Sequence, residues 1–196
     1  FGKSGATLDV SSVLDGMQIV VQPIVDLATG ETYAVEALAR FGHMPGIAVP
    51  EVFRLAHLAG YGHALEAACV SAALRIRADL PSGVRLSVNL SPDSLCHPEV
   101  SKIWPADLDG VIVEVTEYSA TDRAELSDRL NWLRARGAAI AVDDVSTGYA
   151  GLLRLAGMRP ELVKIDRSVI TGVHENEAQT AVLDALVRFS HRIGAA

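Results

Sequence analysis

Short apolar runs rich in β-branched residues alternate along this chain with longer segments whose apolar residues recur every three or four positions. The short runs have the length and composition of β-strands, and the spacing in the longer segments indicates amphipathic helices. The predicted strands cover Met17–Val25, Thr32–Arg40, Val84–Leu90, Val111–Val115, Ala138–Val142 and Leu162–Ile165. The predicted helices cover Pro50–Leu58, Ala64–Leu80, about Asp122–Arg136, a short stretch near Leu152–Leu155, and about Ala178–Ile193.

The connections between these strands predict the topology of the sheet. Residues 26–31 read Asp-Leu-Ala-Thr-Gly-Glu, which is hairpin chemistry, so the first two strands are expected to be antiparallel. The later strands alternate with helices, and this pattern predicts a parallel sheet with right-handed crossovers. A complete eight-stranded α/β barrel typically takes about 250 residues. A 196-residue chain with six strands is therefore about two strand–helix units short of a full barrel.

The beginning of the chain differs from the rest in composition. Residues 1–16 form a polar lead-in with Gly and Ser, expected to end in a short helix around Val10–Leu14. The chain starts with Phe1 rather than Met, so we expect either a fragment of a longer protein or a processed chain. We expect neither a signal peptide nor a membrane span, because no apolar stretch approaches the roughly 20 residues that a bilayer requires.

Composition and charge exclude some classes of function. The net charge of −7 argues against a general nucleic-acid surface, although divalent ions could offset it locally for a small phosphate ligand. Cys69 and Cys96 lack the short spacing of a zinc or redox pair, so we expect reduced thiols and a cytoplasmic protein. The histidines show no zinc-like spacing either, and we interpret them as surface or packing residues: His43, His57, His63, His97, His174 and His191.

Five short apolar runs within the predicted strands each end on an acidic or amide side chain or, in the last case, on a lysine segment that includes an aspartate. The residues are Glu36, Asn89, Glu114, the pair Asp143-Asp144, and the segment Lys164-Ile165-Asp166. Because ligands bind at the carboxyl ends of parallel strands, these side chains are expected to share one site. Carboxylate and amide oxygens suit Mg²⁺ or Mn²⁺, and two ions about 3.5–4 Å apart suit phosphoester hydrolysis. Lys164 would add a fixed positive charge near the water or the phosphoryl oxygens.

Each of these residues also has a plain structural interpretation. Asp143-Asp144 taken alone is best read as a turn or a helix cap, and Asn89 as part of a turn that enters a helix. Glu114 and Glu117 could merely flank an exposed edge. Glu36 is harder to explain in that way, because a carboxylate among small apolar residues is costly unless it is paired or bound to a cation. Five independent coincidences are less plausible than one common site.

At these residues the sequence resembles the EAL domain family, the cyclic di-GMP phosphodiesterases. The resemblance runs in order from about Met17 to Gly194, which makes residues 17–196 the expected EAL domain. Its motifs are Gln22-Pro23-Ile24-Val25-Asp26, Glu36-Ala37-Leu38-Ala39-Arg40, Ser87-Val88-Asn89-Leu90-Ser91, Glu114-Val115-Thr116-Glu117, the segment from Asp143-Asp144 to Thr147-Gly148-Tyr149, and Lys164-Ile165-Asp166-Arg167-Ser168.

The resemblance implies a modified TIM (βα)8 barrel with an antiparallel first strand, and hydrolysis of cyclic di-GMP to the linear dinucleotide. It implies a dimer, and Mg²⁺ or Mn²⁺ as cofactor. By position, Glu36, Asn89, Glu114 and Asp143 would hold one ion, and Asp143 and Asp144 the other. Lys164 would position the attacking water, Gln22 and Arg40 would contact the substrate, and Glu117 would anchor the loop after Asp144.

Two departures from the family pattern bear on activity. Val145-Ser146 stands where the family normally has Phe-Gly. In the family, this loop couples substrate binding, metal binding and dimerisation. The family also continues beyond the helix that ends near Gly194, with a glutamate-bearing strand and a unit bearing a glutamine. We therefore expect a truncated or partial domain, or one completed by a partner. The alternatives to an enzyme are a degenerate domain that binds cyclic di-GMP or a protein partner, or a purely structural domain; an upstream sensory domain is also expected.

Overall fold

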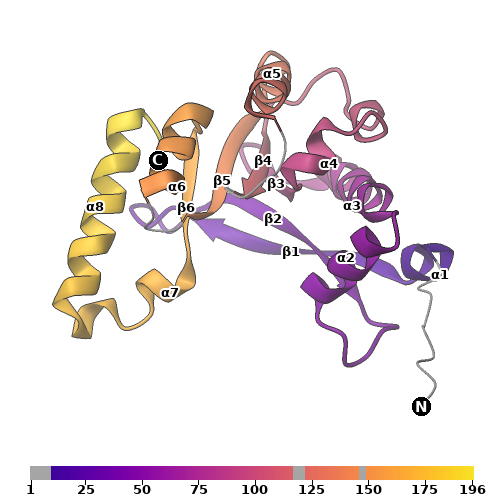
Figure 1. Cartoon of the computed structure of the whole chain (residues 1–196), viewed down its shortest axis with the longest axis horizontal. Coiled ribbons are helices and arrows are strands. Elements are labelled where there is room, and N and C mark those ends of the chain that lie inside the picture. The colour runs from indigo at the N-terminus through magenta and orange to yellow at the C-terminus, as the bar shows by residue number, and fades with distance from the viewer. Residues whose placement is uncertain (1–9, 117–121, 146–148) are drawn as a thin grey trace. The chain divides into compact units, whose positions relative to one another are not determined.

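The computed structural model describes residues 10–116, 122–145 and 149–196 (Figure 1). The chain divides into two compact units. The first comprises the chain up to Asn89 together with Asp93–Pro105, and the second comprises Leu90–Pro92 and Ala106–Ala196. Most of the predicted lead-in, residues 1–9, lies outside the described residues. Among the helices of the described ranges, none is long and apolar enough to cross a membrane.

The first unit contains a three-stranded sheet in the order β1-β2-β3. Strands β1 and β2 are antiparallel and β2 and β3 are parallel, which confirms the predicted hairpin and the change to parallel pairing. Its strands and helices are α1 Val10–Asp15, β1 Met17–Val25, β2 Thr32–Phe41, α2 Val49–Leu58, α3 Gly62–Ile76, the 3-10 turn η1 Arg77–Asp79, β3 Arg85–Asn89 and the 3-10 turn η2 Val100–Lys102. Helix α4, Pro92–Cys96, follows β3.

Helices α2 and α3 pack against each other and cover this sheet. Val52 and Ala56 lie four positions apart on α2, so both fall on the same helical face, and both are fully buried. They meet Phe41 from β2 and Leu65 from α3 in one apolar cluster that also includes Val13. This packing fixes α2 and α3 against the face of β2 that carries Phe41.

The second unit is built from parallel strands in the order β4-β5-β6. Residues 111–115 of β4 are all buried, as expected for a parallel strand covered on both faces. The strands and helices are β4 Val111–Thr116, α5 Arg123–Arg134, β5 Ala139–Val145, α6 Tyr149–Met158, β6 Leu162–Ile165, α7 Arg167–Ile170, the 3-10 turn η3 Val173–Glu175 and α8 Glu177–Ile193.

Arg134 and Glu161 hold the amino-terminal end of these strands together. The Arg134 guanidinium donates to Glu161 Oε1 at 2.8 Å and to the carbonyls of Met158 and Arg159 at 2.9 and 2.7 Å, at the end of α6. Glu161 Oε2 accepts the backbone N–H of Ile140 at 2.7 Å. The pair therefore connects α5, α6 and β5 at the end of the sheet opposite the strand exits.

All six predicted strands are present in the described residues, although β5 is longer than predicted, and several helix boundaries differ from the prediction. Helix α3 ends at Ile76 rather than Leu80, because the chain tightens into a 3-10 turn there. Helix α6 is longer than the predicted stretch near Leu152–Leu155. The beginning of α8 was placed one residue too late, at Ala178, since Asn176 caps the helix by accepting the N–H of Gln179. The short segments α7 and η3 were missed.

Candidate active site

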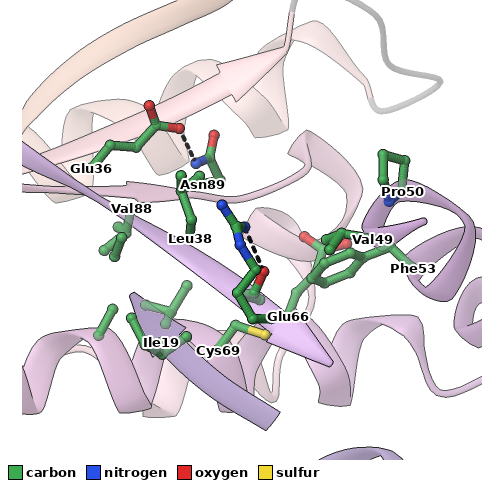
Figure 2. A pocket seen from close by; sticks show the side chains of 15 residues that line it. Ile19, Glu36, Leu38, Val49, Pro50, Phe53, Glu66, Cys69, Val88 and Asn89 are labelled. Carbon is green, nitrogen blue, oxygen red and sulfur yellow. Dashed lines mark hydrogen bonds between the residues drawn. The ribbon is translucent and has the colours of Figure 1, made fainter. Parts of the chain in front are cut away.

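In the first unit, Glu36 and Asn89 form a polar pair at neighbouring strands. Glu36 pairs with Gln22 across the β1–β2 ladder and with Ser87 across the β2–β3 ladder. Asn89 stands two residues beyond Ser87, so its side chain is on the same face of the sheet. Its Nδ2 donates to Glu36 Oε1 at 2.8 Å (Figure 2). Two side chains 53 positions apart in sequence thus form one hydrogen-bonded pair at the end of β3.

A cavity of about 290 Å³ lies beside this pair, entirely within the first unit. Glu36, Arg40 and Asn89 supply polar lining, and Phe53 and Pro50 from α2 form part of an apolar wall (Figure 2). Arg40 is exposed, and its Nη1 donates to the carbonyl of Ala39 at 2.9 Å. A mostly apolar cavity with a few polar groups at one side is the usual form of a small-molecule site.

Two lining residues of this cavity escaped the sequence interpretation. Glu66, only 6% exposed, and Cys69 reach it from α3. Burial, and to a smaller extent the negative charge of Glu66, raises the pKa of the Cys69 thiol to about 12. The thiol therefore stays protonated and does not act as a nucleophile. The sequence feature that could have indicated Glu66 is its position in a helix, Gly62–Ile76, that otherwise carries few polar residues.

In the second unit, Glu114, Asp143 and Lys164 converge from three adjacent strands. Glu114 is 2% exposed, and Lys164 Nζ lies 2.5 Å from its Oε2 and 3.5 Å from Asp143 Oδ2. The parallel register places Thr116 of β4 opposite Asp143 of β5, so Glu114 and Asp143 share a face. A buried carboxylate is costly without a cation, and the lysine supplies that charge.

An irregularity in the β5–β6 ladder brings the aspartate pair to the lysine. Val142 pairs with Val163 and Val145 pairs with Ile165, so Asp143 and Asp144 together stand opposite the single residue Lys164. Such a bulge bends the strand and changes the direction of a side chain, and bulges are common beside active sites. Because both aspartates belong to β5, the interpretation of this pair as a turn or helix cap is wrong.

Some of the predicted site lies outside what the structure describes. Glu117, the expected loop anchor, lies outside the described residues, as do Ser146 and the Thr147-Gly148 part of the loop motif. The backbone of Asp144 is part of β5, but its side chain is not among those described. The proposed roles of Asp144 and Glu117 therefore remain predictions from the sequence.

Carboxylate and amide oxygens are the type of ligand that a divalent cation prefers. In this structure they occur as two pairs. Glu36 and Asn89 form one pair in the first unit, and Glu114 and Asp143 form the other in the second. Within the described ranges, no three His, Cys, Asp or Glu side chains are close enough together to hold a metal ion. The carboxylates of Glu114 and Asp143 nevertheless converge on one positive charge, Lys164 Nζ, and carboxylate oxygens are ligands that hard cations prefer.

An α/β fold with an antiparallel first strand, and acidic and amide residues at successive strand ends, defines a class of barrel-type domains. The model of the EAL domain family matches residues 8–196. The chain therefore belongs to the EAL domain family.

Named relatives and solved structures agree with this assignment. The chain is 28% identical over 190 residues to the probable cyclic di-GMP phosphodiesterase PdeN of Escherichia coli, covering 89% of this chain and 36% of PdeN. It resembles the PaMucR phosphodiesterase in its c-di-GMP complex, with a TM-score of 0.80 and 25% identity over 95% of this chain and 82% of that one. It also resembles BlrP1 of Klebsiella pneumoniae in a calcium and cyclic di-GMP complex, with a TM-score of 0.78, 28% identity and coverage of 92% and 48%.

Proposed function

We propose that the intact domain hydrolyses one phosphodiester bond of cyclic di-GMP to give the linear dinucleotide. The observation that carries this proposal is the convergence of the buried Glu114 and of Asp143 on Lys164, at positions that match the family motifs. The similarity to PdeN and to the PaMucR phosphodiesterase supports the choice of substrate. The chain spans about a third of PdeN, so the activity of the whole protein is part of the proposal.

Divalent ions, Mg²⁺ or Mn²⁺ and two in number, would supply the charge that activates water and stabilises the leaving oxygen. Glu36, Asn89, Glu114 and Asp143 would hold the first, and Asp143 and Asp144 the second. Lys164 would position the water whose oxygen attacks phosphorus, while the P–O ester bond breaks and the leaving oxygen gains a proton. An ammonium fixed between two carboxylates is suited to orienting water, because its geometry needs no rearrangement during the reaction.

Substrate binding would involve the motif residues and the cavity of the first unit. Arg40 would contact a phosphate, for which its guanidinium fork is well suited. Gln22, which faces Glu36 across the β1–β2 ladder, would contact the substrate from the neighbouring strand. The cavity beside Glu36 and Arg40 has apolar walls that could accept the flat face of a guanine base.

The test is production of the linear dinucleotide by the intact protein with Mg²⁺ or Mn²⁺. We expect Lys164→Met to lower kcat by about 10²–10³-fold, the usual loss when one preorganised electrostatic contact is removed. Binding of cyclic di-GMP in Ca²⁺ should change far less. His191→Asn, at an exposed position of α8, serves as the matched control and should retain full activity. A folded, metal-binding protein without turnover would refute the proposal.

A second candidate function is binding of cyclic di-GMP, or of a protein partner, without hydrolysis. Val145-Ser146 in place of the family's Phe-Gly favours it, because the change falls directly after the two aspartates. Calorimetry with Ca²⁺ in place of Mg²⁺ separates this candidate from the first. Binding without turnover in Mg²⁺ would support it, and absence of binding would eliminate a cyclic di-GMP sensor.

The partners of the domain are proposed on the same basis. We expect a homodimer, since the family couples the loop after Asp144 to dimerisation, and an upstream sensory or signalling domain in a cytoplasmic protein. PdeN, of which this chain covers 36%, is long enough to hold further domains. Light scattering of the intact protein tests the dimer directly.

A further inference from the structure

Three histidines that are distant in sequence come together in the first unit, away from the motif residues. His57 lies in the last turn of helix α2, His63 lies in the first turn of α3, and His97 follows α4. The rings of His63 and His97 stack with centroids 4.3 Å apart and planes 14° apart. The ring of His57 meets His63 edge to face at 5.4 Å. Imidazole rings therefore contribute a contact among α2, α3 and the segment after α4.

Hydrogen bonds fix each ring in this cluster. His57 Nε2 lies 2.6 Å from Glu66 Oε1, and His63 Nδ1 lies 2.8 Å from the buried Ser94 Oγ. His97 Nδ1 accepts the backbone N–H of Glu99 at 3.4 Å.

The sequence provides space for the His57 ring at the beginning of α3. A Cβ added to Gly62 would come within 2.3 Å of ring atoms of His57, far inside the closest real contacts. Glycine at position 62 is therefore a requirement of this packing. It allows the ring to lie directly over the first turn of α3, next to His63.

Several features favour the neutral form of His63. It stands at the amino-terminal end of a 15-residue helix, where the helix dipole opposes positive charge. Burial lowers the pKa of His63 below its ordinary value of 6.5, and the neighbouring His97 and His57 lower it further. Glu66 and Asp93, the acidic groups that face it from α3 and α4, act in the opposite direction but are smaller in effect.

We propose that His57, His63 and His97 form a pH-sensitive contact among α2, α3 and the segment after α4, which weakens when the ring of His63 takes up a proton. Acid would place a positive charge on this ring, which stacks on the ring of His97, and would loosen the contact. Glu66 transmits the change, because it accepts the hydrogen bond of His57 and also lines the cavity beside Glu36 and Arg40. This inference does not depend on the proposed phosphodiesterase activity.

The sign of the effect follows from the lowered pKa of His63. Between 6.5 and the lower folded-state value, the unfolded chain binds a proton at His63 that the folded chain does not bind. The stabilisation is thus complete above pH 6.5 and declines as the pH falls through that window. One linked proton raises the equilibrium constant for unfolding by up to about tenfold for each unit by which the pH falls.

The experiment is urea denaturation of the full chain between pH 7.5 and 5.0, for the native protein and for His63→Asn. Asn can keep a hydrogen bond to Ser94 Oγ but does not titrate. We expect the free energy of unfolding to fall less steeply with decreasing pH in His63→Asn, by a slope equivalent to at most one bound proton. The control His191→Asn should have the same slope as the native protein. Equal slopes for native protein and His63→Asn would overturn the proposal.

A second measurement keeps the proposal testable if His63→Asn does not fold. NMR titration of the histidine ring protons in the native protein should give a midpoint below 6.5 for His63, whose resonance is assigned through its proximity to Ser94. Hydrogen exchange in residues 93–103 should increase over the same pH range, after correction for intrinsic rates. A His63 midpoint at or above 6.5 would refute the proposal.

Discussion

At the scale of single residues, Glu114 imposes the strongest energetic constraint on the site. Its side chain is only 1% exposed, and Lys164, whose side chain is 29% exposed, contacts it at 2.5 Å. Desolvation of a carboxylate costs several kcal/mol, and a nearby cation repays that cost only when the geometry is good. The stability of the pair therefore depends on the lysine, because any change that removes its positive charge leaves a buried anion without its partner.

Lys164→Met is expected to lower the free energy of unfolding by roughly 2–4 kcal/mol, because it leaves the Glu114 carboxylate buried without its cation. Equilibrium denaturation in urea, without added metal, measures the loss. The double variant Lys164→Met/Glu114→Gln should recover part of it, since the amide carries no charge. Strictly additive losses in the double variant would show that the two side chains do not depend on each other.

The sequence supplied some of these residues and not others, for a physical reason. Glu114, Asp143 and Lys164 could be predicted because the ends of adjacent parallel strands meet at one edge of a sheet. Glu66 and His57 could not, since their approach depends on how α2 packs on α3. Crossing geometry between helices depends on side-chain interlocking, which strand periodicity does not encode.

At the scale of elements, helix α5 depends for stability on the capping residue that precedes it, Asp122. Asp122 Oδ1 accepts the backbone N–H groups of Ala124 at 2.8 Å and Glu125 at 3.2 Å. These bonds satisfy two of the amide donors that a helix leaves without partners at its beginning. The carboxylate is also favoured there by the helix dipole.

Asp122→Ala should therefore destabilise the protein by about 1 kcal/mol, the usual cost of losing a capping side chain. Asp128→Ala, at an exposed position inside the same helix, is the matched control. It should leave stability unchanged or raise it slightly, because Ala has the higher helix propensity. Urea denaturation of both variants measures the difference, and equal values would contradict the role of Asp122 as a cap.

The elements that sequence reasoning placed well are those with a strong periodic pattern. Strands β1 and β6 have the predicted boundaries, since β-branched runs bounded by turn residues have few alternative structures. Strand β5 continues past its predicted end at Val142 to Val145, because the bulge at the aspartate pair keeps charged residues within the ladder. Helix α7 has four residues, too few for any periodicity to appear.

At the scale of the whole molecule, the proposed ligand set requires residues of both units. Glu36 and Asn89 come from the first unit, and Glu114, Asp143 and Lys164 from the second. Either pair alone would supply two of the six ligands that Mg²⁺ prefers, and bound waters can fill the other positions. From the ligand set of the family motifs, we propose that one ion takes its ligands from both pairs.

This requirement predicts a thermal shift that can be measured without any turnover. Mn²⁺ at 100 times its Kd should stabilise the native intact protein by about 2.7 kcal/mol, since binding only to the folded state adds RT ln(1 + [L]/Kd). Glu36→Gln in one unit and Glu114→Gln in the other should each abolish most of that gain, and the double variant should lose no more than either alone. His191→Asn should keep the full shift. Independent, additive losses would instead indicate two separate ion sites, one in each unit, because changes at sites that share one ligand are not additive.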